Sequence, residues 1–272
     1  FGILLVEVAF SQTVVKHFTV DNGLPSTEIY FIHQDVEGYF WICTDRGISQ
    51  YDGTSFTNYS TADGLTHNTI FKCFEDKNFD LWFTALDGTL TIYDRSEGRF
   101  NAFEGNESLL KHYIGGRKWI HYIGFRNDSV FLLPLGHCYQ KLFAFKHQKP
   151  TRINLIDYDK ANSNCLKFDN IRVIDDNILG LNRRYWKVLH LYHSLDTLIY
   201  SDYLGKYDAN FDRGNSFHQI KEQAFVCKRN GLSCVTEDGA EIEYFEGHYV
   251  SSVLMDNEGF YWVSTVDNGV YV

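Results

Sequence analysis

Three aspartates recur at the same place in similar segments of the chain, and a set of carboxylates could serve acid–base chemistry or bind calcium. They are Asp35, Asp76 and Asp256. Equivalent positions of a repeat lie in separate units, so the repeat should keep the three carboxylates far apart. An aspartate that opens a turn commonly accepts hydrogen bonds from the backbone of that turn. We therefore expect these residues to cap turns rather than to form a catalytic or calcium site.

A tryptophan follows each of these aspartates at the same distance along the chain, and its ring could stack on a sugar. The three are Trp41, Trp82 and Trp262. Because they share one strand position of the repeat, we expect them to pack as wedges between repeated units in the core. The spacing Asp-x-x-Gly-x-x-Trp is one residue longer than the Asp-box of sialidases and lacks its preceding serine, so that motif does not fit.

Histidines and nucleophiles offer no further chemistry. The 11 histidines include no HExxH motif and no pair at i, i+4 beside a carboxylate, so we predict no metal site and no cofactor. His193, Ser194 and Asp196 are close in sequence, but a catalytic triad is defined by its geometry. We predict no catalytic residue.

The elements that must position these side chains come from an internal repeat. The segment Asp35–Asp52 holds an acidic residue, a glycine turn, a tryptophan in an apolar strand and a second glycine turn. Much of this pattern returns 41 residues later, and it returns again near the end of the sequence. The positions that we assign to structural roles in the repeat are Asp35, Gly38, Trp41, Thr44, Gly47, Asp76, Trp82, Gly88, Asp256, Gly259, Trp262 and Thr265.

A period in the low forties that carries several short strands indicates the blades of a β-propeller. We predict an all-β fold of four-stranded antiparallel blades over residues 12–272, with about six blade units. Between Asn106 and about Asn215 the pattern weakens, and the apolar runs there fit two degenerate blades. The strands expected in the first two blades are Ile29–Gln34, Tyr39–Thr44, Ile48–Tyr51, Ser55–Tyr59, Thr69–Glu75, Asp80–Thr84, Thr89–Tyr93 and Arg99–Phe103.

The segment Val14–Val20 leaves two arrangements open. It could supply the outermost strand of the last blade and close the ring, or the chain could be cut before a further blade. The final unit, Tyr249–Val272, supplies three strands without a cap. We expect the second arrangement, in which the units are cut from a propeller of seven or more blades.

Ligand specificity should lie where the sequence departs from the repeat, at blade ends and loops. The divergent middle contains Trp119, Trp186, the pair Arg183–Arg184 and many tyrosines. This is an expectation about a region, and the ligand-binding residues themselves are unknown from the sequence.

Composition agrees with a β-rich globular domain. Hydrophobic residues make up 44% of the 272 residues and aromatic residues 17%, and abundant Phe and Tyr favour strands. The net charge of -10 argues against a nucleic-acid partner for this segment, because such a partner requires a basic surface. The acidity is spread along the chain, which is typical of a soluble surface.

The first residues have features of an export signal. Gly2–Phe10 is apolar, and Ala9-x-Ser11 provides the small residues of a cleavage site, with Gln12 as the first mature residue. We expect residues 1–11 to be a truncated signal peptide, and a first β-strand is the alternative. No run of about 18 apolar residues occurs, so no membrane span is predicted.

Two of the six cysteines flank a predicted hairpin. Asn230-Gly231 is a strong two-residue turn signal, and counting outward from it places Cys227 opposite Cys234. Opposed cysteines are within reach of a disulfide, although a hydrogen-bonded pair orients the Cβ atoms less favourably. Whether these two are bonded stays open, whereas Cys43 and Cys73 are expected to be buried thiols.

The repeat resembles that of the two-component regulator propeller family. The family's repeat contains Asp-Gly-Leu-Pro, an apolar strand, Asp-x-x-Gly-x-x-Trp-Ile-x-Thr and Gly-Leu-x-x-Tyr-Asp-Gly before a phenylalanine. The similarity is strong over residues 18–94, good over 249–272 and weak between them. The matching positions of the first copy are Phe18, Asn22–Pro25, Ile29–Ile32, Asp35, Gly38, Trp41-Ile42, Thr44, Gly47-Ile48, Tyr51–Gly53 and Phe56.

The resemblance implies a role that composition does not. Members of this family form the periplasmic sensor region of hybrid histidine kinases, bind a ligand that is often an oligosaccharide, and signal to cytoplasmic kinase parts. For this chain it implies a non-enzymatic segment on the periplasmic side of the bacterial inner membrane. The implied partners are a small-molecule or oligosaccharide ligand, C-terminal membrane and kinase regions beyond this sequence, and a second copy in a homodimer.

Two other functions stay open, because a fold does not determine a function. An exported propeller lyase or glycan hydrolase would need charged residues that converge on a central pocket. A protein-interaction scaffold would show a broad apolar patch on one face instead of a pocket.

Overall fold

The computed structural model consists almost entirely of β-strands. It describes residues 16–112, 120–126, 129–134, 142–146, 149–153, 168–174, 177–182, 186–191, 198–202, 216–220, 223–235 and 241–272. The expected signal peptide at residues 1–11 lies outside the described residues. The same holds for Trp119, Arg183–Arg184, His193–Asp196 and the side chain of Trp186.

The first two sheets, which we call blades 1 and 2, contain the two clearest sequence repeats. In each blade four strands follow one another as an antiparallel meander. Their bounds agree with the predicted strands to within one residue at each end. The strands of blade 1 are β2 (Ile29–Gln34), β3 (Phe40–Thr44), β4 (Gly47–Tyr51) and β5 (Phe56–Tyr59), and those of blade 2 are β6 (Ile70–Glu75), β7 (Leu81–Ala85), β8 (Leu90–Asp94) and β9 (Arg99–Ala102).

Blades 3 and 4 lie where the repeat weakens, and blade 5 follows them. One helix and one strand in the weak region are not marked by its apolar runs. The helix is α1 (Asn106–His112), and the strand is the one that carries Pro150. Proline cannot donate to a ladder, but it is tolerated on the outermost strand of a sheet, where this strand lies. The strands of blade 3 are β10 (Ile120–Arg126), β11 (Ser129–Pro134), β12 (Leu142–Lys146) and β13 (Lys149–Ile153). Those of blade 4 are β14 (Phe168–Ile174), β15 (Asn177–Asn182), β16 (Trp186–Leu191) and β17 (Leu198–Asp202). Those of blade 5 are β18 (Ser216–Ile220), β19 (Gln223–Lys228), β20 (Gly231–Val235) and β21 (Glu241–Tyr244).

Blade 6 brings together strands from the two ends of the described chain. Phe18 pairs with Val270, and Lys16 and Val272 exchange backbone hydrogen bonds of 3.2 and 2.9 Å. The sequence leaves two arrangements open for Val14–Val20. In the structure, a short strand within this segment is the outermost strand of the last sheet and completes its four strands. The number of blades in the whole protein stays a prediction. The strands of blade 6 are β1 (His17–Phe18), β24 (Val270–Tyr271), β23 (Tyr261–Thr265) and β22 (Val250–Met255).

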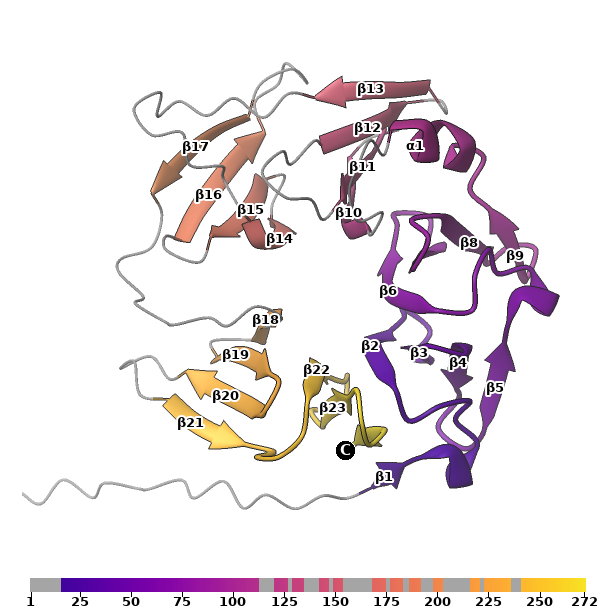
Figure 1. Ribbon diagram of the computed structural model, residues 1–272, viewed down its shortest axis with the longest axis vertical. Helices are drawn as coiled ribbons and strands as arrows, with labels where there is room; N and C mark the ends of the chain where they lie inside the picture. The colour runs from indigo at the N-terminus through magenta and orange to yellow at the C-terminus, as the bar shows by residue number, and fades with distance from the viewer. Residues whose placement is uncertain are drawn as a thin grey trace, which may run out of the picture.

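The six sheets formed by the described residues stand in a ring (Figure 1). The first strands of the sheets, from β2 round to β22, lie nearest the centre. Strand β2 contacts β6 on one side and β22 on the other, β14 contacts β10 and β18, and β18 contacts β22. This arrangement confirms the predicted all-β propeller with four-stranded antiparallel blades.

The core lies between the faces of neighbouring blades. The buried cluster at the contact of blades 1 and 2 combines Trp41 and Ile48 with Leu81 and Phe83. The thiols of Cys43 and Cys73 are buried in the same cluster, as predicted, and burial raises the pKa of both. Because both faces of a blade are covered, the middle strands are apolar almost without interruption.

A glycine at the start of the third strand allows the outermost strand to pass close by. Gly47 has a φ of +118°, and a Cβ atom there would lie 2.0 Å from the carbonyl oxygen of Tyr59. Gly231 has the same role in blade 5, with a φ of +120° and 2.8 Å to the Tyr244 carbonyl. No other residue type fits this conformation and this space without displacing the backbone.

The predicted pairing of Cys227 with Cys234 is wrong, and the role of Gly231 explains the error. Gly231 begins β20 and pairs with Lys228, so the two-residue turn is Arg229-Asn230 rather than Asn230-Gly231. Cys227 therefore pairs with a leucine, and Cys234 pairs with a phenylalanine. Both cysteines are buried, free thiols.

The Gly47→Ala substitution should destabilise the fold far more than Gly53→Ala. Gly53 also has a positive φ, of +95°, but nothing lies within 4 Å of the position that an alanine methyl would take there. We expect a loss of about 1 kcal/mol at Gly53 from backbone strain and of about 3 kcal/mol or more at Gly47, where the backbone of β5 must also move. Urea unfolding of both variants checks this, and equal losses would contradict the close approach.

The free state of Cys227 and Cys234 can be counted chemically. Without reductant, the native protein should leave both thiols unlabelled by an alkylating reagent, because their side chains are at most 3% exposed. After unfolding in the same buffer, peptide mass analysis should find both alkylated. A disulfide would instead leave them unlabelled until a reductant is added.

Candidate ligand-binding pocket

Each repeat aspartate closes the turn between the first and second strands of its blade. Asp35 Oδ1 accepts hydrogen bonds from the backbone N–H groups of Glu37 at 3.0 Å and Tyr39 at 2.9 Å, and Oδ2 accepts one from the Trp41 indole at 2.8 Å. The turns lie in three different blades, and their carboxylates are occupied by these bonds. The same bonds recur at Asp76 from Asn78, Asp80 and Trp82, and at Asp256 from Glu258, Phe260 and Trp262.

The three tryptophans of the repeat lie between blades and are at most 7% exposed. Trp41 contacts Tyr93 of blade 2, with ring centroids 5.1 Å apart, and Trp262 stacks on Phe40 of blade 1 at 3.8 Å. Trp82 contacts Phe125 of blade 3 at 5.4 Å. Their faces are therefore covered by protein, and none of them is accessible for stacking on a sugar.

The remaining repeat positions hold the turns of their blades. Thr44 Oγ1 donates to the Gly47 carbonyl at 2.9 Å, and Thr265 Oγ1 donates to the Gly269 carbonyl at 3.0 Å. Blade 2 has Ala85 at this register position. The other glycines of the repeat have positive φ in turns, and they are Gly38, Gly88 and Gly259.

Arg95 connects blade 2 to the aspartate turn of blade 1. Its Nη2 donates to Asp35 Oδ2 at 3.1 Å and to Glu75 Oε1 at 3.3 Å. Its Nη1 pairs with Glu37, and its Nε donates to the Phe79 carbonyl at 2.9 Å. The Arg95 side chain is only 18% exposed, so its single positive charge stabilises the neighbouring carboxylates out of bulk water, and the cluster as a whole stays negative.

The contact of blades 6 and 1 shows what Arg95 adds. There, Gln34 Oε1 accepts a hydrogen bond of 3.0 Å from the backbone N–H of Asn257. At the contact of blades 1 and 2 the equivalent acceptor is Glu75 Oε1, which lies 3.3 Å from the backbone nitrogen of Val36. The backbone hydrogen bond is the same at both contacts, but Glu75 is charged where Gln34 is neutral, and Arg95 supplies the matching cation.

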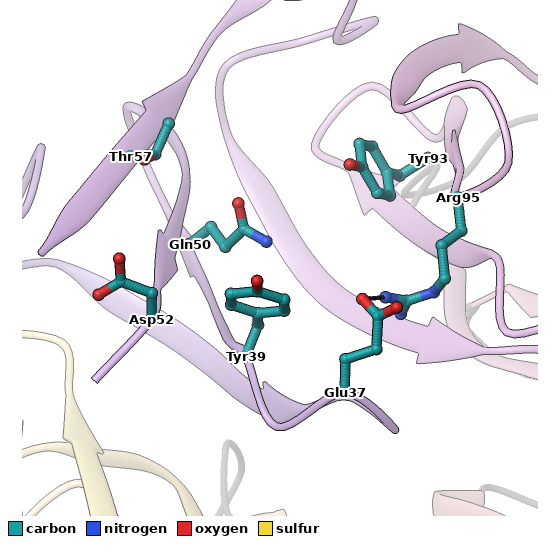
Figure 2. Close-up of a pocket in the computed structure, with 7 residues that line it drawn as sticks. All are labelled: Glu37, Tyr39, Gln50, Asp52, Thr57, Tyr93 and Arg95. Atoms are coloured by element: carbon teal, nitrogen blue, oxygen red, sulfur yellow. Dashed lines mark hydrogen bonds and ion pairs between the residues drawn. The ribbon is translucent and has the colours of Figure 1, made fainter. Parts of the chain in front are cut away.

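A polar pocket of about 440 Å³ lies beside Arg95 between blades 1 and 2 (Figure 2). It opens on the face where the first strands turn into the second and the third into the fourth. Its size falls in the range of small-molecule sites. The residues that line it are Glu37, Tyr39, Gln50, Asp52, Thr57, Tyr93 and Arg95.

Four lining side chains have polar atoms without a protein partner in the part of the chain that the structure describes. The Tyr59 hydroxyl donates to Gln50 Oε1 at 3.0 Å, which leaves the Gln50 amide hydrogens for the pocket. Figure 2 shows the hydroxyls of Tyr39 and Tyr93 directed into the space between the blades, with Thr57 on the opposite wall. Burial raises the pKa of Tyr93, so its hydroxyl keeps its proton and can donate.

The charged groups of the pocket already have protein partners. Asp52 Oδ1 accepts hydrogen bonds of 2.7 Å from the backbone N–H groups of Ser55 and Thr54, and these bonds lower the pKa of Asp52. Glu37 is paired with Arg95. A carboxylate with a lowered pKa is a weak base, and the carboxylates around the pocket outnumber Arg95, so the site favours neutral hydrogen-bonding ligands over anions.

Metal and membrane sites are not found among the described residues. No three His, Cys, Asp or Glu side chains gather there in a way that could hold a metal ion. No helix within the described ranges has the length and apolarity needed to cross a membrane.

The sequence did not single out the pocket residues, since the expected ligand region was the divergent middle of the chain. Tyr39, Gln50 and Thr57 are ordinary strand and turn residues of the first repeat. One signal was present: Arg95 follows Tyr93-Asp94 where Gly53 follows Tyr51-Asp52 in blade 1, so a long cation replaces the smallest residue, in a turn that is also longer.

Comparison by sequence finds no protein-family model and no curated protein that matches the chain. Comparison by structure finds many solved propellers. The extracellular domain of a protein described as hybrid two component system BT3049 from B. thetaiotaomicron superposes with a TM-score of 0.68 at 14% identity, over 95% of this chain and 41% of that one. The corresponding domain of BT4673 gives 0.58 at 14% identity, over 94% and 42%.

This chain spans about two fifths of the length of those two chains. An inactive variant of virginiamycin B lyase from Staphylococcus aureus, solved with quinupristin, also superposes, with a TM-score of 0.55 at 10% identity, over 92% of this chain and 81% of that one. The fold is thus shared with extracellular domains of hybrid two-component systems, which agrees with the resemblance seen in the sequence, and also with an enzyme.

The Arg95→Met substitution should destabilise the protein, because it leaves the fully buried Asp35 carboxylate and the mostly buried Glu75 without their cation. Removing one partner of a buried pair costs about 3–5 kcal/mol, and the partial exposure here reduces our expectation to about 2–3 kcal/mol. Arg99→Met is the matched control: its partner Glu97 is exposed, and we expect a change within about 0.5 kcal/mol. Urea unfolding of both variants measures the difference, and a near-neutral Arg95→Met would show that the network contributes little.

Proposed function

We propose that this chain is the ligand-sensing segment of a two-component sensor outside the cytoplasm, and that its ligand is a neutral, hydroxyl-rich compound such as an oligosaccharide. The observation that carries the proposal is the pocket between blades 1 and 2, with its uncommitted hydroxyl and amide groups. The fold shared with extracellular domains of hybrid two-component systems supports the sensory part.

The chemistry of the lining favours hydroxyl groups as ligands. A sugar hydroxyl both donates and accepts, and the hydroxyls of Tyr39, Thr57 and Tyr93 can take either role. The Gln50 amide donates, and the Asp52 carboxylate accepts. The two tyrosine rings add apolar surface beside these groups, which suits a ligand with both polar and apolar faces.

The proposal treats the segment as non-enzymatic. Glu37 is paired and Asp52 is hydrogen-bonded to its own turn, so the pocket offers no uncommitted acid–base pair. Signal output then belongs to membrane and kinase regions of the same polypeptide on the C-terminal side, and a second copy of the chain is a further partner of the intact receptor.

The Tyr93→Phe substitution tests the pocket, since it removes one hydroxyl and keeps the ring that packs against Trp41. With an oligosaccharide identified from a defined panel by calorimetry, we expect affinity to fall roughly five- to tenfold, the value of one hydrogen bond. Tyr249→Phe in blade 6 makes the same chemical change away from the pocket and should leave affinity unchanged.

Two results would overturn the proposal. If no saccharide of the panel binds, or if both tyrosine variants bind like the parent protein, the pocket is not the ligand site. If mass spectrometry shows that a bound saccharide is consumed, the exported lyase or glycan hydrolase becomes the better function. The sensory part is tested in the gene: the reading frame after Val272 should lead into a membrane span and a kinase or DNA-binding module.

A further inference from the structure

The exposed apolar side chains gather on one face of the ring. Four of the large ones among the described residues lie on the same turn of three consecutive blades, the turn between first and second strands. Of the other three, Val20 and Leu86 are at the opposite ends of the strands, and Ile242 is on the outermost strand β21 of blade 5. We call the turns Asp35–Tyr39, Asp76–Asp80 and Asp256–Phe260 the turn row. Its exposed apolar residues are Val36, Tyr39, Phe79 and Phe260.

The turn row is continuous, because hydrogen bonds fasten each turn to the next blade. Gln34 of β2 accepts from the backbone of Asn257, and Glu75 of β6 accepts from the backbone of Val36. Arg95 then spans the turns of blades 1 and 2 through Glu37 and the Phe79 carbonyl. Strands β22, β2 and β6 stand side by side in Figure 1, so the three turns form one surface.

Phe79 stands in a backbone conformation that the repeat otherwise gives to glycine. Its φ is +67°, and the residues at the equivalent position of blades 1 and 6 are Gly38 and Gly259. A bulky residue in the left-handed region is strained. The ring of Phe79 is 49% exposed and has no aromatic contact within the described part of the chain. Folding therefore gains little from this side chain, and another role must account for it.

The apolar residues of the turn row are set among carboxylates. Glu37 and Glu258 are exposed beside Tyr39 and Phe260, and Lys77 is the one lysine or arginine within the three turns, all of which the structure describes. The adjoining turns between third and fourth strands add further acidic groups, and Arg95 is consumed by its own partners. The carboxylates of the row and the adjoining turns that are not buried are Glu37, Asp52, Asp76, Asp80, Asp94, Glu97 and Glu258; Glu97 pairs with Arg99, and Asp35 and Asp256 are buried.

This charge selects the occupant. Two copies of an acidic face repel each other, and an anionic lipid surface is repelled in the same way. A polypeptide that carries lysine or arginine beside apolar side chains is attracted, and its apolar groups can cover Phe79 and Phe260. We propose that the turn row docks a partner polypeptide segment in which basic residues flank aromatic or aliphatic ones.

The proposal is tested with a defined probe, a short amphipathic peptide of Leu and Lys with one Trp, titrated by fluorescence. It should bind with an affinity that falls as salt is added, while a matched Leu–Glu peptide should not bind. A double variant, Phe79→Gly with Phe260→Ser, should lose about tenfold in affinity. Val20→Ser with Leu86→Ser removes similar exposed groups from the other face and should change affinity by less than about twofold.

Stability and self-association complete the test. Phe79→Gly should unfold at the same or a higher urea concentration than the parent protein, because glycine relieves the left-handed strain. A lower midpoint would mean that the ring serves the fold, and this overturns the proposal. If neither double variant loses affinity for the peptide, charge attraction alone holds it, and this also overturns the proposal. Sedimentation that reveals a dimer abolished by Phe79→Gly would assign the row to a second copy instead.

The test of the turn row, which rests in part on the same acidic surroundings as the proposed pocket, can be read separately from the test of saccharide binding. Phe79 and Phe260 do not line the pocket, and Tyr39, which belongs to both, is left unchanged. Tyr93→Phe should therefore weaken saccharide binding without altering peptide binding. If the pocket variant behaves as expected and the turn-row variant does not, the turn-row assignment is wrong. The opposite result would show that the pocket assignment is wrong.

Discussion

The indole N–H of Trp41 must find an acceptor when the ring is buried between two blades, and the rest of the interface depends on how Asp35 satisfies it. The carboxylate uses one oxygen for the indole and the other for two backbone N–H groups of its turn. The turn, the direction of β3 and the position of the wedge are thereby fixed together. Three blades repeat this arrangement, so the spacing between sheets is set by the same geometry each time.

The pocket depends on the same carboxylate through Arg95. Asp35 Oδ2 accepts from the indole and from the Arg95 guanidinium, and Arg95 in turn pairs with Glu37 at the edge of the pocket. Tyr93 lines the pocket and also packs on Trp41. The wall that would meet a ligand is therefore continuous with the core of the interface, which is how a site gains rigid support.

The strands of blades 1 and 2 follow from the sequence because each is marked by local signals: an apolar run, a capping aspartate and a glycine turn. The register around Gly231 does not follow from the sequence. That glycine is needed because the carbonyl of Tyr244 on the outermost strand passes close to it, and this contact is not local in the sequence. The sequence does not indicate the strand that carries Pro150, because proline is uncommon in strands. The pocket is hidden for a different reason: it joins residues of two blades, and each residue is unremarkable in its own repeat.

The ring formed by the described sheets is closed by a short seam, in which the two-residue strand β1 pairs with β24. Around a closed ring, the angles between neighbouring sheets must add up to a full turn. A ligand that enters between blades 1 and 2 and widens their contact must narrow another contact between blades or stretch the seam. Strand β1 ends at Phe18 and the next β-strand of the chain is β2 of blade 1, which begins at Ile29, so the seam lies next to the blade that this widening would move. The ring thus converts a local displacement between two sheets into tension at this short seam.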